Sequence, residues 1–272
     1  MSSPILTGLL WLMLVVIPSP RALAYCLDDW ACVDIIETEH KIEFWLSNNK
    51  AYPITSTLEV KTRNLSSPKQ SKNEYTQTLV LRGFQRILAL SLVVTDPQLS
   101  RDYSERFNWA PGSMHARHNV NYRYSVPYKK GEHYPIVQGF GGGYSHQGAS
   151  KYAIDIAMPV GTPIHAARDG VVIDIVEKHH RGGASRSYAK YANYVVILHS
   201  DDTTGEYYHL RKNGAAVEVG AKVVAGQHIA YSGNTGFSSL PHLHFAVYKA
   251  KSHGNYQSLP FEFNQKVSQP DW

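Results

Sequence analysis

Two histidines alternate along one short segment of this sequence. His242 and His244 lie within residues 241–247, where the residues between and after them are apolar. If this segment is a strand, successive side chains point to opposite faces, so both imidazoles share one face and the apolar side chains share the other. Neutral imidazole is a common metal ligand. Alone, the pattern is more often a half-exposed strand face than a metal site.

A carboxylate stands within a second apolar segment. Residues 152–157 predict a strand in which Asp155 shares its face only with Ala153 and Ala157. A buried carboxylate without a partner is costly, and a metal ion would relieve that cost. Pairing with a backbone turn, or with an arginine such as Arg168, is an equally simple interpretation.

Further histidines occur in the same half of the chain. The sequence contains 14 histidines, most of them after residue 130. His146 precedes the segment that holds Asp155, and His209 lies in a strand predicted over residues 206–210, on the face of Tyr207. Taken alone, His209 is a surface histidine beside a turn. This concentration of histidines predicts that any metal site lies in the C-terminal half.

Together these pieces resemble the lysostaphin/LytM-type zinc metallopeptidases, over about residues 135–263. One feature departs from that family. Many members have a short His-x-x-x-Asp motif, whereas eight residues separate His146 from Asp155 here. A longer loop can still bring both residues to one metal. The matching motifs are His146 and Asp155, the segments 158–163, 166–172 and 193–196, Tyr208-His209-Leu210, the turn 232–236, and His242-Leu243-His244-Phe245.

The resemblance implies a zinc site and two catalytic histidines. His146, Asp155 and His244 would bind Zn²⁺, while His209 and His242 would face the substrate. Three protein ligands leave a fourth position for water, and zinc can lower the pKa of that water to about 7. One of the two catalytic imidazoles would assist proton transfer and the other would donate to the developing oxyanion; the sequence does not assign which. No His-Glu-x-x-His motif occurs, so an imidazole must serve as the base.

The implied reaction is hydrolysis of peptide cross-links or stem peptides of bacterial peptidoglycan by metal-activated water. Two alternatives stay open. Some family relatives have lost metal ligands and instead activate cell-wall amidases, but the complete ligand set here argues against that role. The other alternative is a secreted protease that acts on Gly-rich proteins.

Composition and charge are those of a mildly basic globular protein. The 272 residues are 43% hydrophobic and 18% charged, with a net charge of +5, which favours attraction to an anionic surface such as cell wall. No Lys/Arg-rich helix or known nucleic-acid motif appears, so we expect no nucleic-acid partner. The basic insert 178–190 is either a solvated hairpin tip or a wall of the substrate groove. We expect a monomer.

The elements that must position these side chains are strands. No segment shows a sustained helical repeat. The fold class is therefore mainly β, with a small N-terminal β-domain (25–126) and a C-terminal peptidase domain (127–272), for which the resemblance implies an antiparallel β-sheet of the LytM type. The expected strands are 41–46, 54–61, 76–82, 87–94 and 119–126 in the first part, and 152–157, 171–176, 194–199, 206–210 and 242–248 in the second.

The N-terminal part carries no catalytic constellation. Its polar stretch 96–119, with Pro97 and Pro111, predicts a long loop. We expect this domain either to bind cell wall or to cover the groove, in which case His115 and His118 could reach the zinc.

The first 24 residues are typical of a signal peptide. The apolar run 5–17 is too short for a comfortable membrane span, and Ala22-Leu23-Ala24 offers small residues for cleavage. An uncleaved membrane anchor is the alternative. After cleavage we expect a periplasmic or secreted protein with no stable membrane insertion. In such an oxidising compartment a Cys26–Cys32 disulfide is slightly favoured over two free thiols.

Overall fold

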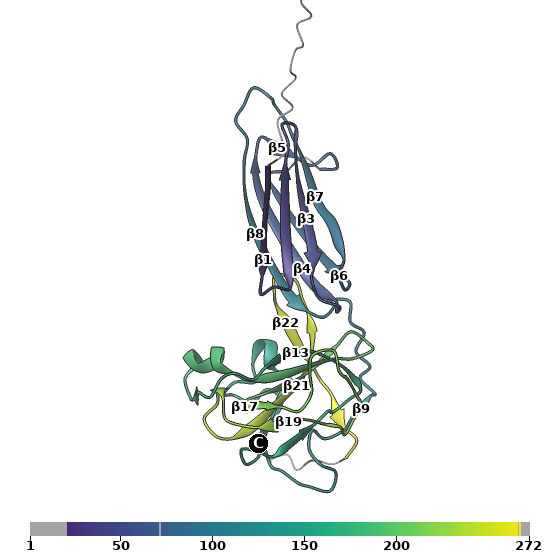
Figure 1. Cartoon of the computed structure of the whole chain (residues 1–272), viewed down its shortest axis with the longest axis vertical. Helices are drawn as coiled ribbons and strands as arrows, with labels where there is room; N and C mark the ends of the chain where they lie inside the picture. The colour runs from purple at the N-terminus through teal and green to yellow at the C-terminus, as the bar shows by residue number, and fades with distance from the viewer. Residues whose placement is uncertain (1–20, 71, 266, 268–272) are drawn as a thin grey trace, which may run out of the picture.

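The computed structural model describes residues 21–70, 72–265 and 267 (Figure 1). Nearly all regular structure is β, apart from two short 3₁₀ helices, η1 (Gly148–Ser150) and η2 (Arg186–Tyr191). The predicted mainly β class is confirmed. Residues 1–20 of the predicted signal peptide lie outside the described residues. Among the described residues, no helix has the length and apolar character needed to cross a membrane.

Residues 21–111 form two antiparallel sheets that share one apolar core. Along β3 every second residue is buried, so that Phe44 points inward between the sheets while its neighbours in sequence are only half buried. The two sheets pack as an elongated sandwich (Figure 1). The first sheet contains β1 (Arg21–Leu27), β2 (Ala31–Glu37), β3 (Lys41–Asn48), β7 (Arg86–Val94) and β5 (Leu65–Ser66), and the second contains β6 (Glu74–Leu81), β4 (Ile54–Arg63) and β8 (Asp102–Pro111).

Two sequence predictions in this part were wrong. The expected loop 96–119 contains the ten-residue strand β8, which pairs with β4 along its whole length. Tyr103, Phe107 and Trp109 alternate in this segment, but the polar residues between them hide the period. The expected strand 119–126 is reduced to β9 (Arg123–Tyr124). Polar turn residues precede it, and it pairs only with β23 (Glu262–Phe263).

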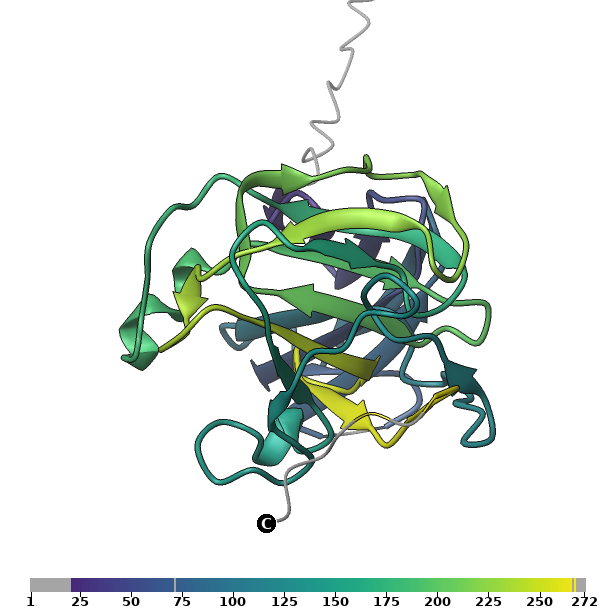
Figure 2. The ribbon, with the colours of Figure 1, turned by 90° about the horizontal axis from the view of Figure 1, so that it is seen from below.

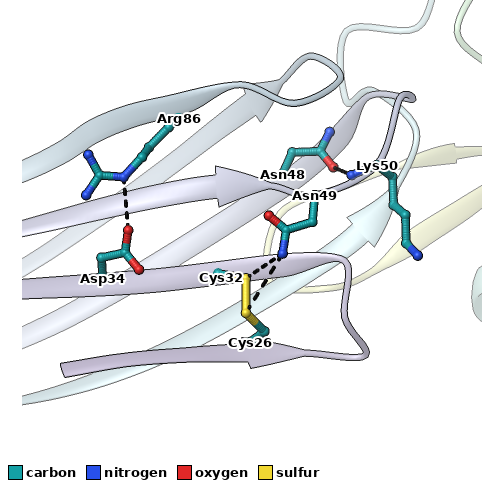
Figure 3. The surroundings of a disulfide bond; sticks show 7 residues. All are labelled: Cys26, Cys32, Asp34, Asn48, Asn49, Lys50 and Arg86. Carbon is teal, nitrogen blue, oxygen red and sulfur yellow. Dashed lines mark hydrogen bonds and ion pairs between the residues drawn. A yellow bond between two sulfur atoms is a disulfide. The ribbon is translucent and has the colours of Figure 1, made fainter.

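A disulfide closes the first hairpin of the sandwich (Figure 3). Cys26 and Cys32 lie opposite each other in the β1–β2 register and are bonded, so the predicted pairing is confirmed. The side chain of Asn49 donates to the sulfur of Cys32 at 3.0 Å. The bond ties β1, otherwise an exposed edge strand, to the rest of the sheet.

The C-terminal half is built on one large sheet with a second apolar core. Tyr124 and Val126, which precede the predicted boundary at residue 127, also pack in this core. The domain boundaries therefore stay a prediction. The smaller sheets are β12 (Pro163–His165), β19 (His228–Ser232) and β17 (Leu210–Ala215), and the parallel pair β14 (Gly182–Gly183) and β20 (Gly236–Phe237). The large sheet has the order β10 (Ile136–Gln138), β11 (Ile154–Ala157), β21 (His242–Ala250), β16 (Thr204–Tyr208), β15 (Tyr194–Leu198), β13 (Gly170–Val176) and β18 (Lys222–Val223), with β22 (Tyr256–Leu259) on β21.

The sandwich and the large sheet are in direct contact. Ile173 and Val196, on β13 and β15, belong to the apolar core of the sandwich. The turn between β21 and β22 also reaches the sandwich, where the backbone N–H of His253 donates to Thr57 Oγ1 at 2.9 Å. Figure 2 shows the strands of the C-terminal half in front of those of the sandwich. The strand that carries His242 and His244 is therefore braced by the N-terminal sheets.

Candidate metal centre and groove

Asp155 and His244 meet because β11 and β21 are adjacent antiparallel strands. Their register places Asp155 directly opposite His244, and Ala157 opposite His242. Directly opposite residues point to the same face of a sheet. The apolar residues of β21, among them Leu243 and Phe245, are fully buried on the other face, as the alternation predicted.

Three ligand atoms converge on this face. Asp155 Oδ1 lies 2.9 Å from His244 Nδ1 and 3.0 Å from His146 Nε2, and the two imidazole nitrogens are 3.3 Å apart. All three side chains could hold one metal ion, since their ligand atoms lie within 4.8 Å of one another. Two imidazole nitrogens and one carboxylate oxygen are a donor set that suits zinc. The residues present therefore fit the metal that the sequence led us to expect.

Each of these donors is held by a second contact. His146 is completely buried and its Nδ1–H donates to the carbonyl of Gly139 at 2.8 Å, which leaves the Nε2 lone pair facing Asp155. Gln138 Nε2 donates to Asp155 Oδ2 at 2.9 Å and leaves Oδ1 for the cluster. The longer segment between His146 and Asp155 is accommodated by the short helix η1.

The two proposed catalytic histidines lie beside this cluster. The rings of His209 and His242 are 4.6 Å apart, and His242 Nε2 is 3.6 Å from Asp155 Oδ1. His209 Nδ1 contacts the carbonyl of Thr235 at 2.7 Å, and His242 Nδ1 contacts that of Leu240 at 2.7 Å. Because a carbonyl only accepts, Nδ1 of each ring carries the hydrogen and Nε2 stays available.

His209 reaches the groove by a route that strand alternation does not predict. The strand β16 ends at Tyr208, and His209 adopts a left-handed backbone with φ +67°. Tyr207 points into the core against Phe245, whereas His209 faces His242 and His244. The prediction that His209 shares the face of Tyr207 was therefore wrong.

Burial and neighbouring charges set the protonation of these groups. Burial lowers the pKa of His209 to about 3, with smaller contributions from His242 and His244, and burial also lowers the pKa of His242. Burial alone would raise the pKa of Asp155, but its contacts with His146 and His244 lower that pKa overall. At neutral pH the carboxylate is ionised and both imidazoles are neutral.

A groove runs across this cluster. Tyr144 stacks on Phe237 at 5.4 Å, and Arg186 from the basic insert lies beside Phe237, so this insert forms one wall. Tyr208, Tyr248 and Tyr256 lie along the other part of the groove. Within the described residues, every side chain that lines the groove comes after residue 136. His115 and His118 do not line it, and His118 instead contacts the carbonyl of Pro260.

Three residues near the cluster have roles that the sequence did not predict. Gln138 and Tyr248 were not singled out, because neither belongs to a metal-ligand pattern; Tyr248 contacts His244 Nε2 at 3.4 Å. Asn193, which opens the matching segment 193–196, is fully buried and donates to the carbonyls of His179 and Leu210. It secures the backbone next to His209 rather than facing the groove.

Comparison with known proteins agrees with this geometry. The model of "Peptidase family M23" matches residues 149–257. Within this chain, residues 149–257 are an M23 peptidase domain. The chain is 38% identical over 120 residues to glycyl-glycine endopeptidase ALE-1 of Staphylococcus capitis, covering 43% of this chain and 28% of that protein. It is 42% identical over 93 residues to peptidoglycan DD-endopeptidase ShyA of Vibrio cholerae, covering 34% and 19%.

The M23 domain is also similar to solved structures. The structure of LytU is 31% identical over 48% of this chain and 84% of that chain, with a TM-score of 0.35. The structure of lysostaphin from Staphylococcus simulans is 29% identical over 46% of this chain and 47% of that chain, with a TM-score of 0.34. The chain spans 28%, 26% and 19% of the lengths of the first three curated relatives that it matches.

Proposed function

We propose that this protein is a zinc-dependent endopeptidase that hydrolyses peptide cross-links or stem peptides of bacterial peptidoglycan. The observation that carries the proposal is the convergence of His146 Nε2, Asp155 Oδ1 and His244 Nδ1 in a groove that also holds two neutral histidines. Relatives named as endopeptidases of peptidoglycan or of glycyl-glycine bonds support the substrate class.

His146, Asp155 and His244 would hold the ion. A bound zinc ion would supply a water molecule of lowered pKa and would polarise the scissile carbonyl. The chain's own residues do the rest. Nε2 of a neutral His209 or His242 can accept the proton of the attacking water, and the protonated ring can return it to the leaving amine. The other ring can donate to the oxygen on which negative charge develops, and the groove walls orient the peptide.

A second candidate substrate is a Gly-rich peptide, either in wall cross-bridges or in a protein. The similarity to a glycyl-glycine endopeptidase favours it. A non-enzymatic activator of amidases is less well supported, because the three proposed ligands are all present and converge. Product masses from digested wall and from a soluble Gly-rich protein distinguish the two substrates.

We also propose that the protein acts in the periplasm or outside the cell after removal of residues 1–24, as a monomer. Cleavage after Ala24 would remove residues 21–24 of β1 and leave Cys26 in the mature protein. The sandwich would hold the enzyme on the wall. Occlusion of the groove has no support in this arrangement, since the groove-lining residues among those described all come after residue 136.

The test uses the full chain, His244→Ala and the control His40→Ala, which removes an exposed histidine outside the groove. Zinc content is measured by mass spectrometry, folding by circular dichroism, and digestion by release of soluble fragments from purified peptidoglycan. We expect one zinc per chain and digestion for the full chain and the control, and neither for His244→Ala. Digestion by a folded, zinc-free His244→Ala protein would refute the proposal.

A further inference from the structure

A second carboxyl lines the groove apart from the proposed metal ligands. Glu206 lies on β16, two residues before Tyr208, and Tyr208 is opposite His244 in the register of β16 and β21. Two residues of strand span about 7 Å. Glu206 therefore faces the groove within about two residues of extended substrate from the proposed zinc site.

Glu206 is buried, and its side-chain hydrogen-bond donors among the described residues carry no charge. It is 7% exposed, and Thr204 Oγ1 and Tyr208 OH donate to its two oxygens at 2.9 and 3.0 Å. Both donors are uncharged. Among the ion pairs of the described residues none includes Glu206. A buried carboxylate without a counter-charge is costly, so this position favours a cation supplied from outside.

The walls around Glu206 are aromatic. Tyr208, Tyr248 and Tyr256 line the same part of the groove, and the rings of Tyr248 and Tyr256 are 5.2 Å apart, edge to face. For all three, burial is the main cause of a raised pKa and the charge of Glu206 is the next, so their hydroxyls stay neutral close to this carboxyl. Tyrosine faces attract cations, and the attraction grows when water is excluded.

The electrostatics of Glu206 favour a cation beside its carboxyl group. Burial raises the pKa of Glu206 to about 7, against the hydrogen bonds from Thr204 and Tyr208, which lower it. An ammonium ion beside the carboxyl would favour its charged form. The cationic side chain of Arg186 also lines the groove, but it comes from the basic insert and forms no ion pair with Glu206 among the described residues.

We propose that Glu206, with Tyr208, Tyr248 and Tyr256, forms a subsite for a primary ammonium group of the substrate, next to the proposed zinc site. The inference rests on the proposed function and makes it more specific. The favoured substrate is a peptide that carries a free amino group, such as the side chain of a diamino acid, within about two residues of the bond that is cut. An ammonium offers three donors, which the carboxylate and the neighbouring hydroxyls can accept.

The test compares purified peptidoglycan with the same material after acetylation of its free amines, using the zinc-loaded full chain. Acetylation makes the wall more anionic, so general attraction to a basic protein would increase rather than fall. We expect acetylation to lower kcat/KM about tenfold, mainly through KM. Glu206→Gln, which keeps the shape of the side chain, should digest both walls at the same reduced rate. Glu218→Gln, an exposed control, should behave like the wild type.

A second variant covers the case in which Glu206→Gln does not fold. Tyr256 is 48% exposed, so Tyr256→Ala should fold and reduce the discrimination about threefold. Equal digestion of both walls by the wild type would overturn the subsite, as would a Glu206→Gln protein that still prefers untreated wall.

Sedimentation of metal-free protein with each wall separates the subsite from the proposed activity. If the wild type digests neither wall but still binds untreated wall better, and Glu206→Gln loses this preference, the activity fails and the subsite stands. If digestion occurs without any preference in either assay, the subsite fails and the activity stands.

Discussion

The sandwich and the M23 domain bury different kinds of side chain. In the described part of residues 21–111 the buried polar residues are neutral, such as Asn48 and Thr57, and charged pairs such as Lys61–Glu74 lie outside. Buried aspartate, glutamate, histidine and arginine side chains all occur after residue 145 among the described residues. Burying an ionisable group is costly, so buried ionisable side chains are concentrated at functional sites and in structural ion-pair networks. Asp155, Glu206, His209 and His242 line the groove, whereas Arg168 and His199 do not, so the contrast separates the scaffold from the part of the chain that holds the groove.

The largest expected effect is on the groove. Asp155→Asn keeps the size of the side chain but removes the only negative charge among the three proposed ligands. Mutation of a residue that only supports a metal ligand lowers metal affinity about 10–100-fold. Loss of a direct ligand should therefore lower zinc affinity by about 1,000-fold or more. Zinc affinity is measured by competition with a chelator of known strength. An unchanged affinity would mean that the buried carboxyl serves structure alone.

The next effect concerns the scaffold. Phe44 is fully buried and packs edge to face on Tyr103 at 5.4 Å. Phe44→Ala should lower the free energy of unfolding by about 3–5 kcal/mol. Zinc affinity of the folded fraction should not change, because Phe44 does not line the groove. Chemical denaturation gives the first quantity and chelator competition the second, and a large loss of zinc affinity would show that the two regions are not separate in function.

A smaller effect should appear on acidification. Burial lowers the pKa of His199 to about 4, from an ordinary value near 6.5. Between these values the unfolded chain binds the proton and the folded chain does not, so stability falls as pH drops from 6.5 to 4, by up to about 3 kcal/mol from this group.

His199→Asn isolates that contribution. Asparagine can still donate to the carbonyl of Asp169, which His199 Nδ1 contacts at 2.8 Å. Denaturation curves at pH 7 and pH 4 should show a smaller loss of stability in the variant than in the wild type. Equal losses of stability in the two proteins would show that His199 does not contribute to the acid sensitivity of the C-terminal half.

The smallest effect concerns the contact between the two regions. Thr57→Val removes the hydroxyl that accepts the N–H of His253 and should cost about 1 kcal/mol. Amide exchange should accelerate in the turn between β21 and β22. Thr55→Val is the matched control on the same strand, since Thr55 contacts Gly112 and Met114 instead. Unchanged exchange in Thr57→Val would show that the sandwich does not brace the strand of His242 and His244.

The sequence predicted local features of the site better than long-range ones. Alternation around His242 and His244 correctly predicted a strand with one apolar face, because that period is local. The register that places Asp155 opposite His244 joins residues 89 positions apart, and no local signal contains it. The family resemblance, rather than any local pattern, implied that His146, Asp155 and His244 act together. In the structure their ligand atoms lie within 4.8 Å of one another.

Other features could not be read from local patterns. His209 depends on a left-handed backbone after β16, a conformation that is uncommon for residues other than glycine and that strand alternation does not predict. The strand β8 was hidden by its polar residues, and its pairing with β4 outweighs their low strand propensity. Glu206 gave one usable signal, a carboxylate next to aromatic residues in a strand, but only the structure shows that neutral side chains, among the described residues, donate to its two oxygens.

The most direct test of the zinc site is a crystal structure of the zinc-loaded full chain, measured on both sides of the zinc absorption edge. We expect one strong anomalous peak within about 2.0–2.2 Å of His146 Nε2, Asp155 Oδ1 and His244 Nδ1, with His209 and His242 beside it but not bound to it. A zinc-loaded crystal with no peak among these three atoms, or with its peak held by other residues, would contradict the proposed metal centre.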